Sequence, residues 1–352
     1  MDWLPLALTT PTAPNVTGGT QIRDRLGRED VGPDRLAETW EVSDVDGHIA
    51  TVVDGPLARR SLRELATRHP DELVGRGWRG PCFPVLTKFI DATGMLPVHL
   101  HADDETARRL ESKANGKTEA WHILDAGVGA TALAGLKPGV TREALRDALF
   151  AEDWDRVMRR IPVRAGETIY VPGGTLHSFG PDTLLYEIEQ TADIMQHAMT
   201  WNQEDGSPVP PDEREKNIDM LLQELNPEPR PNFVPPLRIA VDEDVDRQFC
   251  VASPFFALER WRAAAGASIR YRFDYATVLS NLGAPVTVYV GGSAQVLGRA
   301  KSLLLPAALG EVLINGPADV LFGYLPDLEE DVRRPLRDAG YTSALIATLG
   351  EV

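Results

Sequence analysis

Short runs in which apolar and polar residues alternate, or in which β-branched residues gather, recur along the whole chain and predict β-strands. In the first half these runs cover residues 48–53, 85–91, 96–101, 119–124, 167–172 and 184–190. In the second half they cover residues 255–261, 268–273, 277–282, 286–291, 302–306 and 319–325. The 27 prolines and 30 glycines fall largely between the runs, where turns are expected. The pattern predicts a mostly β protein.

Helical spacing interrupts the first series of strands. Residues 61–76 have apolar positions at helical spacing, and Pro70 predicts a break between two short helices. Residues 102–113 begin with acidic side chains, which suit a helix N-terminus. Residues 141–161 carry an apolar stripe and predict one long helix. These stripes are expected to pack against a sheet.

The segment 202–236 differs from its surroundings because it is polar, acidic and rich in proline, with one predicted helix at 212–225. It predicts a linker between two β-rich domains. The first domain then covers residues 1–201 and the second covers residues 237–352. The second domain contains no histidine, so it is expected to have a similar architecture without a metal site.

Composition narrows the class of protein. The 352 residues suffice for two domains, and 43% hydrophobic with 25% charged residues is typical of a globular protein. A formal net charge of -16 disfavours nucleic acid and anionic membranes as partners. Cys82 and Cys250 lie near apolar residues and predict buried thiols. The first fifteen residues contain no basic segment followed by an apolar run, so we expect no signal peptide, no membrane span and a cytoplasmic protein.

Four residues predict a metal centre. His99 and His101 are two apart in a predicted strand, so both side chains point the same way. Glu119 follows a turn, and His177 follows a later strand that ends in Pro-Gly-Gly. Three imidazoles and one carboxylate suit a divalent transition metal. Strand histidines are often ordinary packing residues, but the combination favours ligation and suggests an enzyme.

Other ionisable residues have structural interpretations. His122 is expected on the opposite face of its strand from Glu119, where it would pack in the core. His48 and His69 are expected to be surface or packing residues. Lys88 is a candidate to reach the interior and help to bind an anion, although a surface position at the strand end is nearly as compatible with the sequence.

The segment Gly166-Glu-Thr-Ile-Tyr-Val-Pro-Gly-Gly-Thr-Leu-His177, together with the upstream His-x-His, resembles the two-part signature of cupins, which are double-sheet jelly rolls. Further segments resemble type I mannose-6-phosphate isomerases in their order along the chain. These segments are residues 38–41, 83–92, 96–105, 116–124, 166–180, 186–193 and 301–321. The resemblance runs from about residue 35 to the end and implies two cupin domains with inserted and connecting helices.

The resemblance also implies roles for particular residues. Carried over by motif, the family's zinc ligands correspond to His99, His101, Glu119 and His177. Zinc is therefore the preferred metal, and Mn²⁺, Fe²⁺ and Co²⁺ also suit the ligand set. The lysine of the Gly-Lys-Thr-Glu segment, Lys117, is implied to be a site residue.

Two carboxylates are implied to lie near the substrate: Glu38 and Glu187. Glu187 and Glu189 alternate in one strand and face the same way, and spacing alone does not show which of them looks inward.

The chain departs from the family pattern at two site positions. His99 stands where the family usually has Gln, and His197 stands at the position of the family's arginine. An arginine is always charged and binds anions in a fork, whereas histidine is shorter and nearly neutral at pH 7. Three explanations stay open: a different substrate, another residue that supplies the charge, or loss of the isomerase activity.

The expected function is a metal-dependent aldose–ketose isomerase. It would convert mannose 6-phosphate to fructose 6-phosphate, or act on a related sugar, through a metal-stabilised cis-enediolate. Lys117 would hold an oxygen or the phosphate, and His197 or Glu187 would move the proton. Glu38, Lys117 and Lys88 are the candidates for substrate binding. The alternatives are another class of cupin metalloenzyme, such as an oxygenase or a decarboxylase, and a non-catalytic sugar-binding relative. The expected partner is a small sugar or sugar phosphate, and the sequence does not assign an oligomeric state.

Overall fold

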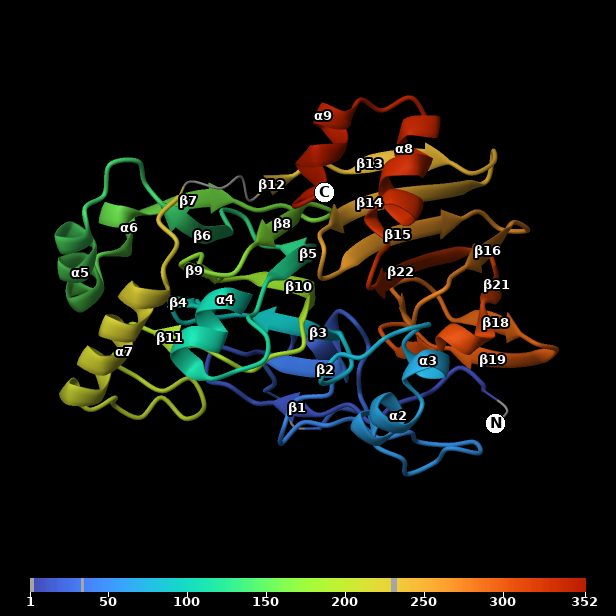
Figure 1. Ribbon diagram of the computed structural model, residues 1–352, viewed down its shortest axis with the longest axis horizontal. Coiled ribbons are helices and arrows are strands. Elements are labelled where there is room, and N and C mark those ends of the chain that lie inside the picture. The colour runs from blue at the N-terminus through green and yellow to red at the C-terminus, as the bar shows by residue number, and fades with distance from the viewer. Residues whose placement is uncertain (1–2, 33–34, 229–232) are drawn as a thin grey trace.

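A computed structural model describes residues 3–32, 35–228 and 233–352. Its strands form four antiparallel sheets, and the helices within residues 142–157 and 211–224 lie together at one end of the molecule (Figure 1). The predicted mostly β fold is confirmed. Residues 1–2 and 33–34 of the predicted first domain and residues 229–232 of the predicted linker lie outside the described residues.

The first half of the chain builds one pair of sheets. Its seven-stranded sheet has the order β1-β2-β3-β10-β5-β8-β12. These strands are β1 (Thr12–Ala13), β2 (Glu38–Val42), β3 (Val85–Ala92), β10 (Thr183–Gln190), β5 (Glu119–Ala126), β8 (Thr168–Val171) and β12 (Phe233–Val234). The five-stranded sheet contains β11 (Gln196–His197), β4 (His99–Leu100), β9 (His177–Phe179), β6 (Thr131–Leu136) and β7 (Met158–Pro162), in that order.

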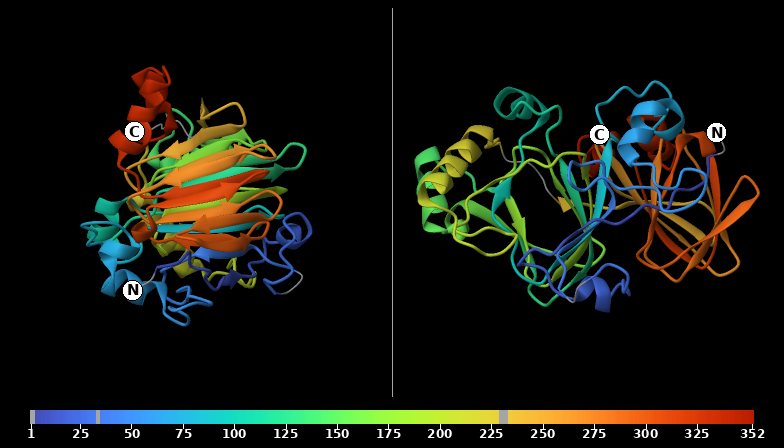
Figure 2. Two further views of the ribbon diagram at one scale, coloured as in Figure 1. Left: turned by 90° about the vertical axis from the view of Figure 1, so that its right-hand side faces the viewer. Right: turned by 90° about the horizontal axis from the view of Figure 1, so that it is seen from below.

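The second half repeats the pairing of two sheets. The six-stranded sheet contains β13 (Leu237–Ala240), β14 (Val245–Ala252), β15 (Ala257–Ala263), β22 (Ala318–Tyr324), β17 (Thr277–Asn281) and β20 (Ser302–Leu305), in that order. The four-stranded sheet contains β16 (Ser268–Arg272), β21 (Glu311–Asn315), β18 (Val286–Val290) and β19 (Ser293–Leu297). Figure 2 shows the two pairs of sheets side by side.

The α-helices are short except for α5 and α7, which have 10 and 14 residues. They are α1 (Gln21–Asp24), α2 (Leu62–Arg68), α3 (Pro70–Leu73), α4 (Asp104–Thr106), α5 (Arg142–Ala151), α6 (Trp154–Val157), α7 (Pro211–Glu224), α8 (Arg334–Asp338) and α9 (Ser343–Ile346). The break at Pro70 and the helix in the acidic segment are confirmed. The predicted helix at 102–113 is the short α4 followed by a π-helical turn, Ala107–Glu111. In the described part of the chain, no helix combines the length and hydropathy of a membrane span.

Two predicted elements are wrong. The single helix expected at 141–161 begins at the Thr141 cap but ends at Ala151, because Glu152 adopts a left-handed conformation with a φ of 55°. Met158 then begins β7, whose pairing with β6 replaces helical hydrogen bonds. The strand expected at 48–53 contains only isolated bridges, at Thr51 and Val52. In the segment 141–161, pairing with β6 overrides the local helical pattern.

The outer face of the seven-stranded sheet packs against the six-stranded sheet of the second half. Along β10, Tyr186 and Ile188 point to this interface: the Tyr186 hydroxyl lies 3.0 Å from the Ser280 hydroxyl, and a Cβ added to Gly323 would meet Ile188 at 2.9 Å. The residues between them, Glu187 and Glu189, therefore point to the other face. One strand thus contributes to the contact between the halves and to the interior of the first half.

The chain crosses between the two halves more than once. Leu6 forms a bridge with Leu304 of the second half, and β12 at the end of the predicted linker pairs with β8 of the first half. The division at residues 201 and 237 stays a prediction.

Candidate metal centre

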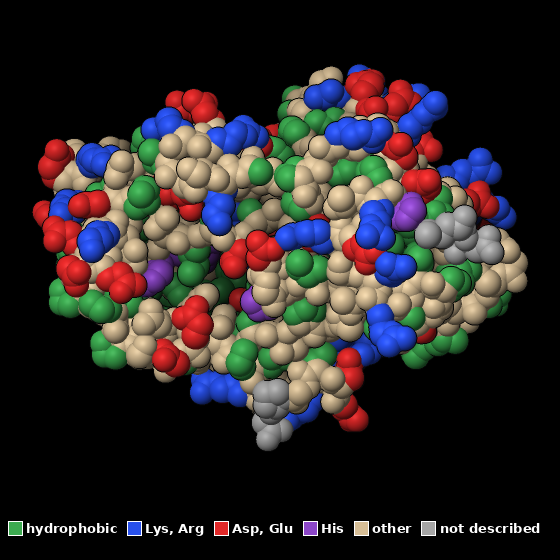
Figure 3. Space-filling model, turned by 60° about the horizontal axis from the view of Figure 1, so that its bottom comes forward, with side chains coloured by type: hydrophobic (Ala, Val, Ile, Leu, Met, Phe, Trp, Pro, Cys, Tyr) green, Lys and Arg blue, Asp and Glu red, His purple; other side chains and the backbone are tan. Residues whose placement is uncertain are grey.

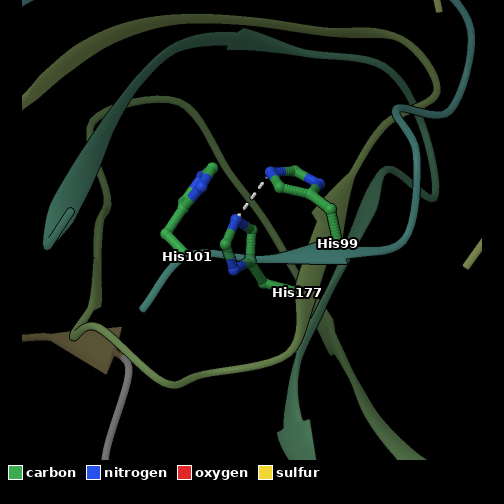
Figure 4. Close-up of side chains that lie close together, drawn as sticks. All are labelled: His99, His101 and His177. Atoms are coloured by element: carbon green, nitrogen blue, oxygen red, sulfur yellow. Dashed lines mark hydrogen bonds between the residues drawn. The ribbon is translucent and has the colours of Figure 1, made fainter. Parts of the chain in front are cut away.

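Three histidines meet inside the first half of the molecule (Figure 4). His99 in β4 is the cross-strand partner of His177 in β9, and His101 follows directly after β4. The Nε2 atoms of His99 and His177 lie 2.9 Å apart. One ring nitrogen of each histidine lies within 4.8 Å of a ring nitrogen of the others. The strand pairing therefore brings together residues that are 78 positions apart in the sequence.

The other ring nitrogen of each histidine fixes its tautomer. Nδ1 of His99 lies 2.7 Å from the Pro97 carbonyl oxygen, and Nδ1 of His177 lies 2.7 Å from that of Thr175. Nδ1 of His101 faces the Ile194 carbonyl in the same way. A carbonyl oxygen only accepts, so each Nδ1 carries the proton and donates it. Each Nε2 is then left with a lone pair, and the three lone pairs converge on one point.

Glu119 supplies a carboxylate to the same point. It begins β5, and its oxygens lie 3.3 Å from Nε2 of His101 and 3.1 Å from Nε2 of His177. The indole N–H of Trp121 donates to it at 2.9 Å. Burial by itself would raise the pKa of Glu119, but His177 and the Lys117 ammonium outweigh it and hold the pKa well below its usual range. Glu119 is therefore a carboxylate anion.

These four residues fit a divalent metal ion. Nε2 of His101 is buried and makes no hydrogen bond within the protein. Burial, reinforced by the Lys117 ammonium, lowers the pKa of His101 to about 3, and burial holds the pKa of His99 well below its usual value. The Nδ1 protons are held by carbonyl oxygens, so a cation at the point where the Nε2 atoms meet is the group that satisfies them. The buried cluster is thus able to bind a divalent metal.

Two buried lysines lie beside the metal centre and share one carboxylate. Glu189 is fully buried, 2.8 Å from Nζ of Lys117 and 3.0 Å from Nζ of Lys88. Lys117 also lies 3.4 Å from Glu119, and Lys88 lies 3.3 Å from Glu187. Burial, reinforced by Glu187, raises the pKa of Glu189 to about 8. Burial also raises the pKa of Glu187.

Glu38 lies next to Lys88 and is held by several neighbouring side chains. Its oxygens accept from Trp40 Nε1 at 2.9 Å and from Asn15 Nδ2 at 3.3 Å, and Lys88 lies 3.6 Å away. The Lys88 ammonium lies over the Trp40 ring at 4.4 Å from its centroid. The His48 ring stacks on the same indole with a centroid distance of 4.4 Å.

A cavity of about 310 Å³ opens from the metal centre to the surface. The space-filling view shows a hollow with acidic and histidine side chains at its edge (Figure 3). The candidate residues from the sequence that line the cavity are Glu38, Lys88, His99, His101, Lys117, Glu119 and Glu187. His177 contacts these ligands from behind. The structure therefore brings together all but one of the candidate site residues.

The exception is His197, which does not line the cavity. It lies in β11, paired with His99, and its half-buried side chain makes no hydrogen bond through Nδ1. Burial lowers its pKa, while Glu204 and Glu213 act in the opposite direction. His197 thus neighbours the metal centre through the backbone, with its side chain outside the cavity.

Other residues of the cavity were not candidates from the sequence. Asn15 and His48 also line it. Glu189 lies behind the cavity wall, and the sequence offered it only as an alternative to Glu187. Alternation in β10 was the one signal for Glu189. Asn15 and His48 carry no periodic signal in the sequence, because their contacts with Glu38 and with the Trp40 ring place them.

The fold and the site define a class: a mostly β protein with paired antiparallel sheets and a buried centre of three histidines and one glutamate. Comparison with known sequences shows which proteins the chain resembles. The chain is 27% identical over 317 residues to a mannose-6-phosphate isomerase of Streptococcus mutans, covering 90% of this chain and 97% of that protein. It is 28% identical over 313 residues to the mannose-6-phosphate isomerase ManA of Bacillus subtilis, covering 88% and 95%. The chain is thus similar over about nine-tenths of its length to proteins that are named mannose-6-phosphate isomerases.

Solved structures agree on the fold. The mannose 6-phosphate isomerase of Bacillus subtilis matches with a TM-score of 0.82 at 23% identity, covering 92% of this chain and 100% of that one. The enzyme of Salmonella typhimurium in its apo form matches with a TM-score of 0.72 at 13% identity, covering 92% and 99%. A scan against protein-family models found no match.

Proposed function

We propose that this protein is a metal-dependent aldose–ketose isomerase that interconverts mannose 6-phosphate and fructose 6-phosphate, or a closely related pair of sugars. The observation that carries the proposal is the convergence of three imidazole lone pairs and the Glu119 carboxylate at the inner end of a cavity that also contains buried ammonium groups. The names of the relatives over nine-tenths of the chain support the same activity.

The residues that would hold the metal are His99, His101, His177 and Glu119. Zinc is the proposed metal, because it accepts mixed nitrogen and oxygen ligands in fourfold coordination. When bound, the metal supplies a Lewis acid that polarises the carbonyl and adjacent hydroxyl of the sugar. The carbonyls of Pro97, Thr175 and Ile194 hold the three rings in the orientation that this binding requires.

Glu187 is the proposed proton carrier. Its carboxylate lines the cavity, and its pKa is raised by burial, which brings it nearer to the pH at which a base works best. The base removes the proton from C2 of the aldose and returns a proton to C1, while the hydroxyl proton passes from the oxygen on C2 to the oxygen on C1. The Trp121 indole donates to Glu187 Oε1 at 3.2 Å and fixes its position.

Lys117 and Lys88 are proposed to stabilise the oxygens that become negative during the proton transfer. Both ammonium groups are buried, at 8% and 5% exposure, so they act in a medium of low polarity. Glu38 is proposed to accept a hydrogen bond from a sugar hydroxyl, since it lines the cavity and is held by Trp40 and Asn15. A cytoplasmic location stays a prediction from the sequence.

The experiment is an isomerase assay on protein from which metal has been removed and then restored. We expect the apoprotein to be inactive on mannose 6-phosphate, and activity to return with about one equivalent of Zn²⁺, Mn²⁺ or Co²⁺. His101→Ala and Glu119→Gln serve as ligand variants that lose metal and activity together. Absence of turnover of every aldose and ketose tested, in a protein that binds the metal stoichiometrically, would reject the isomerase. Oxygen consumption by the iron-loaded protein would favour an oxygenase instead.

A further inference from the structure

The cavity carries more negative than positive side chains. Among the described residues, two basic side chains line the cavity: Lys88 and Lys117. Five carboxylates line the same cavity: Glu38, Glu119, Glu187, Asp193 and Glu204. Glu119 belongs to the metal centre, so outside that centre a dianionic group that entered would meet four carboxylates and two ammonium groups, which is an excess of like charge.

Both lysines are already paired with carboxylates. Lys117 has Glu189 at 2.8 Å and Glu119 at 3.4 Å. Lys88 has Glu189 at 3.0 Å and Glu187 at 3.3 Å, and its ammonium also lies over the Trp40 ring. To bind a phosphate, either ammonium would have to leave buried carboxylates that would then be unpaired, which costs free energy.

The outer end of the cavity is acidic as well. Asp193 and Glu204 line the cavity and are exposed, which places them at its rim. His48 and Gln203 are the half-buried polar residues beside them. The far end of a sugar whose carbonyl end lies at the histidines would face this rim. A hydroxyl group there finds acceptors in the carboxylates, whereas a phosphate finds repulsion.

We infer that the same site also isomerises the uncharged sugar, and that a phosphate group gives it little advantage. Resting on the proposed isomerase function, this extends the substrate class to unphosphorylated aldoses and ketoses. Recognition is then carried by hydroxyl contacts along the cavity and by the metal centre. A phosphate-selective site would need a fork of donors free of other anions, as an arginine provides.

The test is a comparison of mannose 6-phosphate with mannose on the zinc-loaded enzyme at pH 8, where an ordinary imidazole is neutral. We expect kcat/KM for the phosphorylated sugar to exceed that for mannose by less than about tenfold. A larger ratio would overturn the inference and leave the isomerase function intact. Turnover of neither sugar would reject the isomerase function itself, so the two failures are distinguishable.

Ionic strength and rim variants give a second measurement. Salt screens like-charge repulsion, so we expect kcat/KM for mannose 6-phosphate, relative to mannose, to rise between 20 and 300 mM NaCl, which shortens the Debye length to below about 10 Å. We expect the double variant Asp193→Asn, Glu204→Gln to raise the same ratio about fivefold. The matched control Glu243→Gln, Asp338→Asn removes two exposed carboxylates of the second half and should not move it. A ratio that falls with salt, or that the rim variant leaves unchanged, would contradict the inference.

Discussion

Glu187 and Glu189 lie two residues apart on one face of β10 but have different surroundings. Glu187 lines the cavity, whereas Glu189 lies behind the wall between two ammonium groups. The sequence could predict that both point the same way, because side chains alternate along a strand. It could not predict which one lines the cavity, because the depth of the cavity depends on side chains from other strands.

Glu187→Gln tests the assignment of the proton carrier. The amide keeps the shape and the contact with Trp121 but cannot accept the proton, so we expect kcat to fall at least about a hundredfold. Metal content should stay at the wild-type level, because Glu187 is not one of the four proposed ligands. The measurement is steady-state kinetics with metal analysis of the same samples. A kcat within tenfold of wild type would show that another group moves the proton.

His197→Asn tests the one candidate residue whose side chain lies outside the cavity. Because His197 meets the metal centre only through the backbone pairing of β11 with β4, we expect kcat to change by less than about threefold. The measurement is the same assay, with Glu187→Gln as the matched loss of a titratable group. A hundredfold loss of kcat with the metal retained would restore His197 as a catalytic residue.

The turn before His177 connects two of the proposed metal ligands. Gly174 has a φ of 82°, and its N–H donates to the His101 carbonyl at 2.7 Å. A Cβ added there would lie 2.9 Å from Cβ of Asn226. The turn that precedes His177 is therefore hydrogen-bonded to the backbone of His101, and Asn226 leaves no room for a side chain at Gly174.

Gly174→Ala should lower both stability and metal affinity. We expect a loss of about 2–4 kcal/mol, from the left-handed backbone and the contact with Asn226 together. Gly166→Ala is the matched control: its φ is 86°, but nothing lies within 4 Å of the added Cβ, so only the backbone cost of about 1–2 kcal/mol remains. Urea unfolding and zinc titration of both variants give the comparison. Equal losses in the two variants would contradict the argument.

Local patterns predicted the elements that carry the ligands, and long-range packing decided the rest. The spacing of His99 and His101, the turn before His177 and the strand after Glu119 can all be predicted from a few neighbouring residues. Asn15 and His48 reach the cavity because β1 pairs with β2 and because His48 stacks on Trp40. Such contacts leave no periodic trace in the sequence. The helix predicted to continue to residue 161 is wrong for the same reason, because the end of that segment forms β7 and pairs with β6.

At the scale of the molecule, His122 links the two halves. Its Nε2 lies 3.2 Å from the Arg260 guanidinium, which is paired with Asp319, and its Nδ1 lies 3.0 Å from the Thr168 hydroxyl. The structural role expected from the sequence fits this position on the outer face of the sheet. Burial, followed by the charge of Arg260, lowers the pKa of His122 to about 3.

This shift predicts a loss of stability in mild acid. The folded pKa lies below the ordinary value of 6.5, so the unfolded chain binds the proton first. The stabilisation is complete above about pH 6.5 and declines as the pH falls toward 3, by about 2 kcal/mol between pH 7.5 and pH 5. His122→Asn should remove this part of the pH dependence. Urea unfolding of both proteins at the two pH values measures it, and parallel losses in both would refute the assignment.

Because β10 contributes both to the contact between the halves and to the cavity, it limits how the sequence of this strand can change in evolution. Tyr186 and Ile188 hold the second half in place, and Glu187 and Glu189 serve the cavity, so both sets depend on the same register. Deleting or inserting one residue early in the strand would turn the carboxylates toward the apolar interface and the aromatic ring toward the cavity. Single substitutions in this strand can therefore accumulate during evolution. An insertion or a deletion would remove the contact between the halves and the carboxylates of the cavity at the same time.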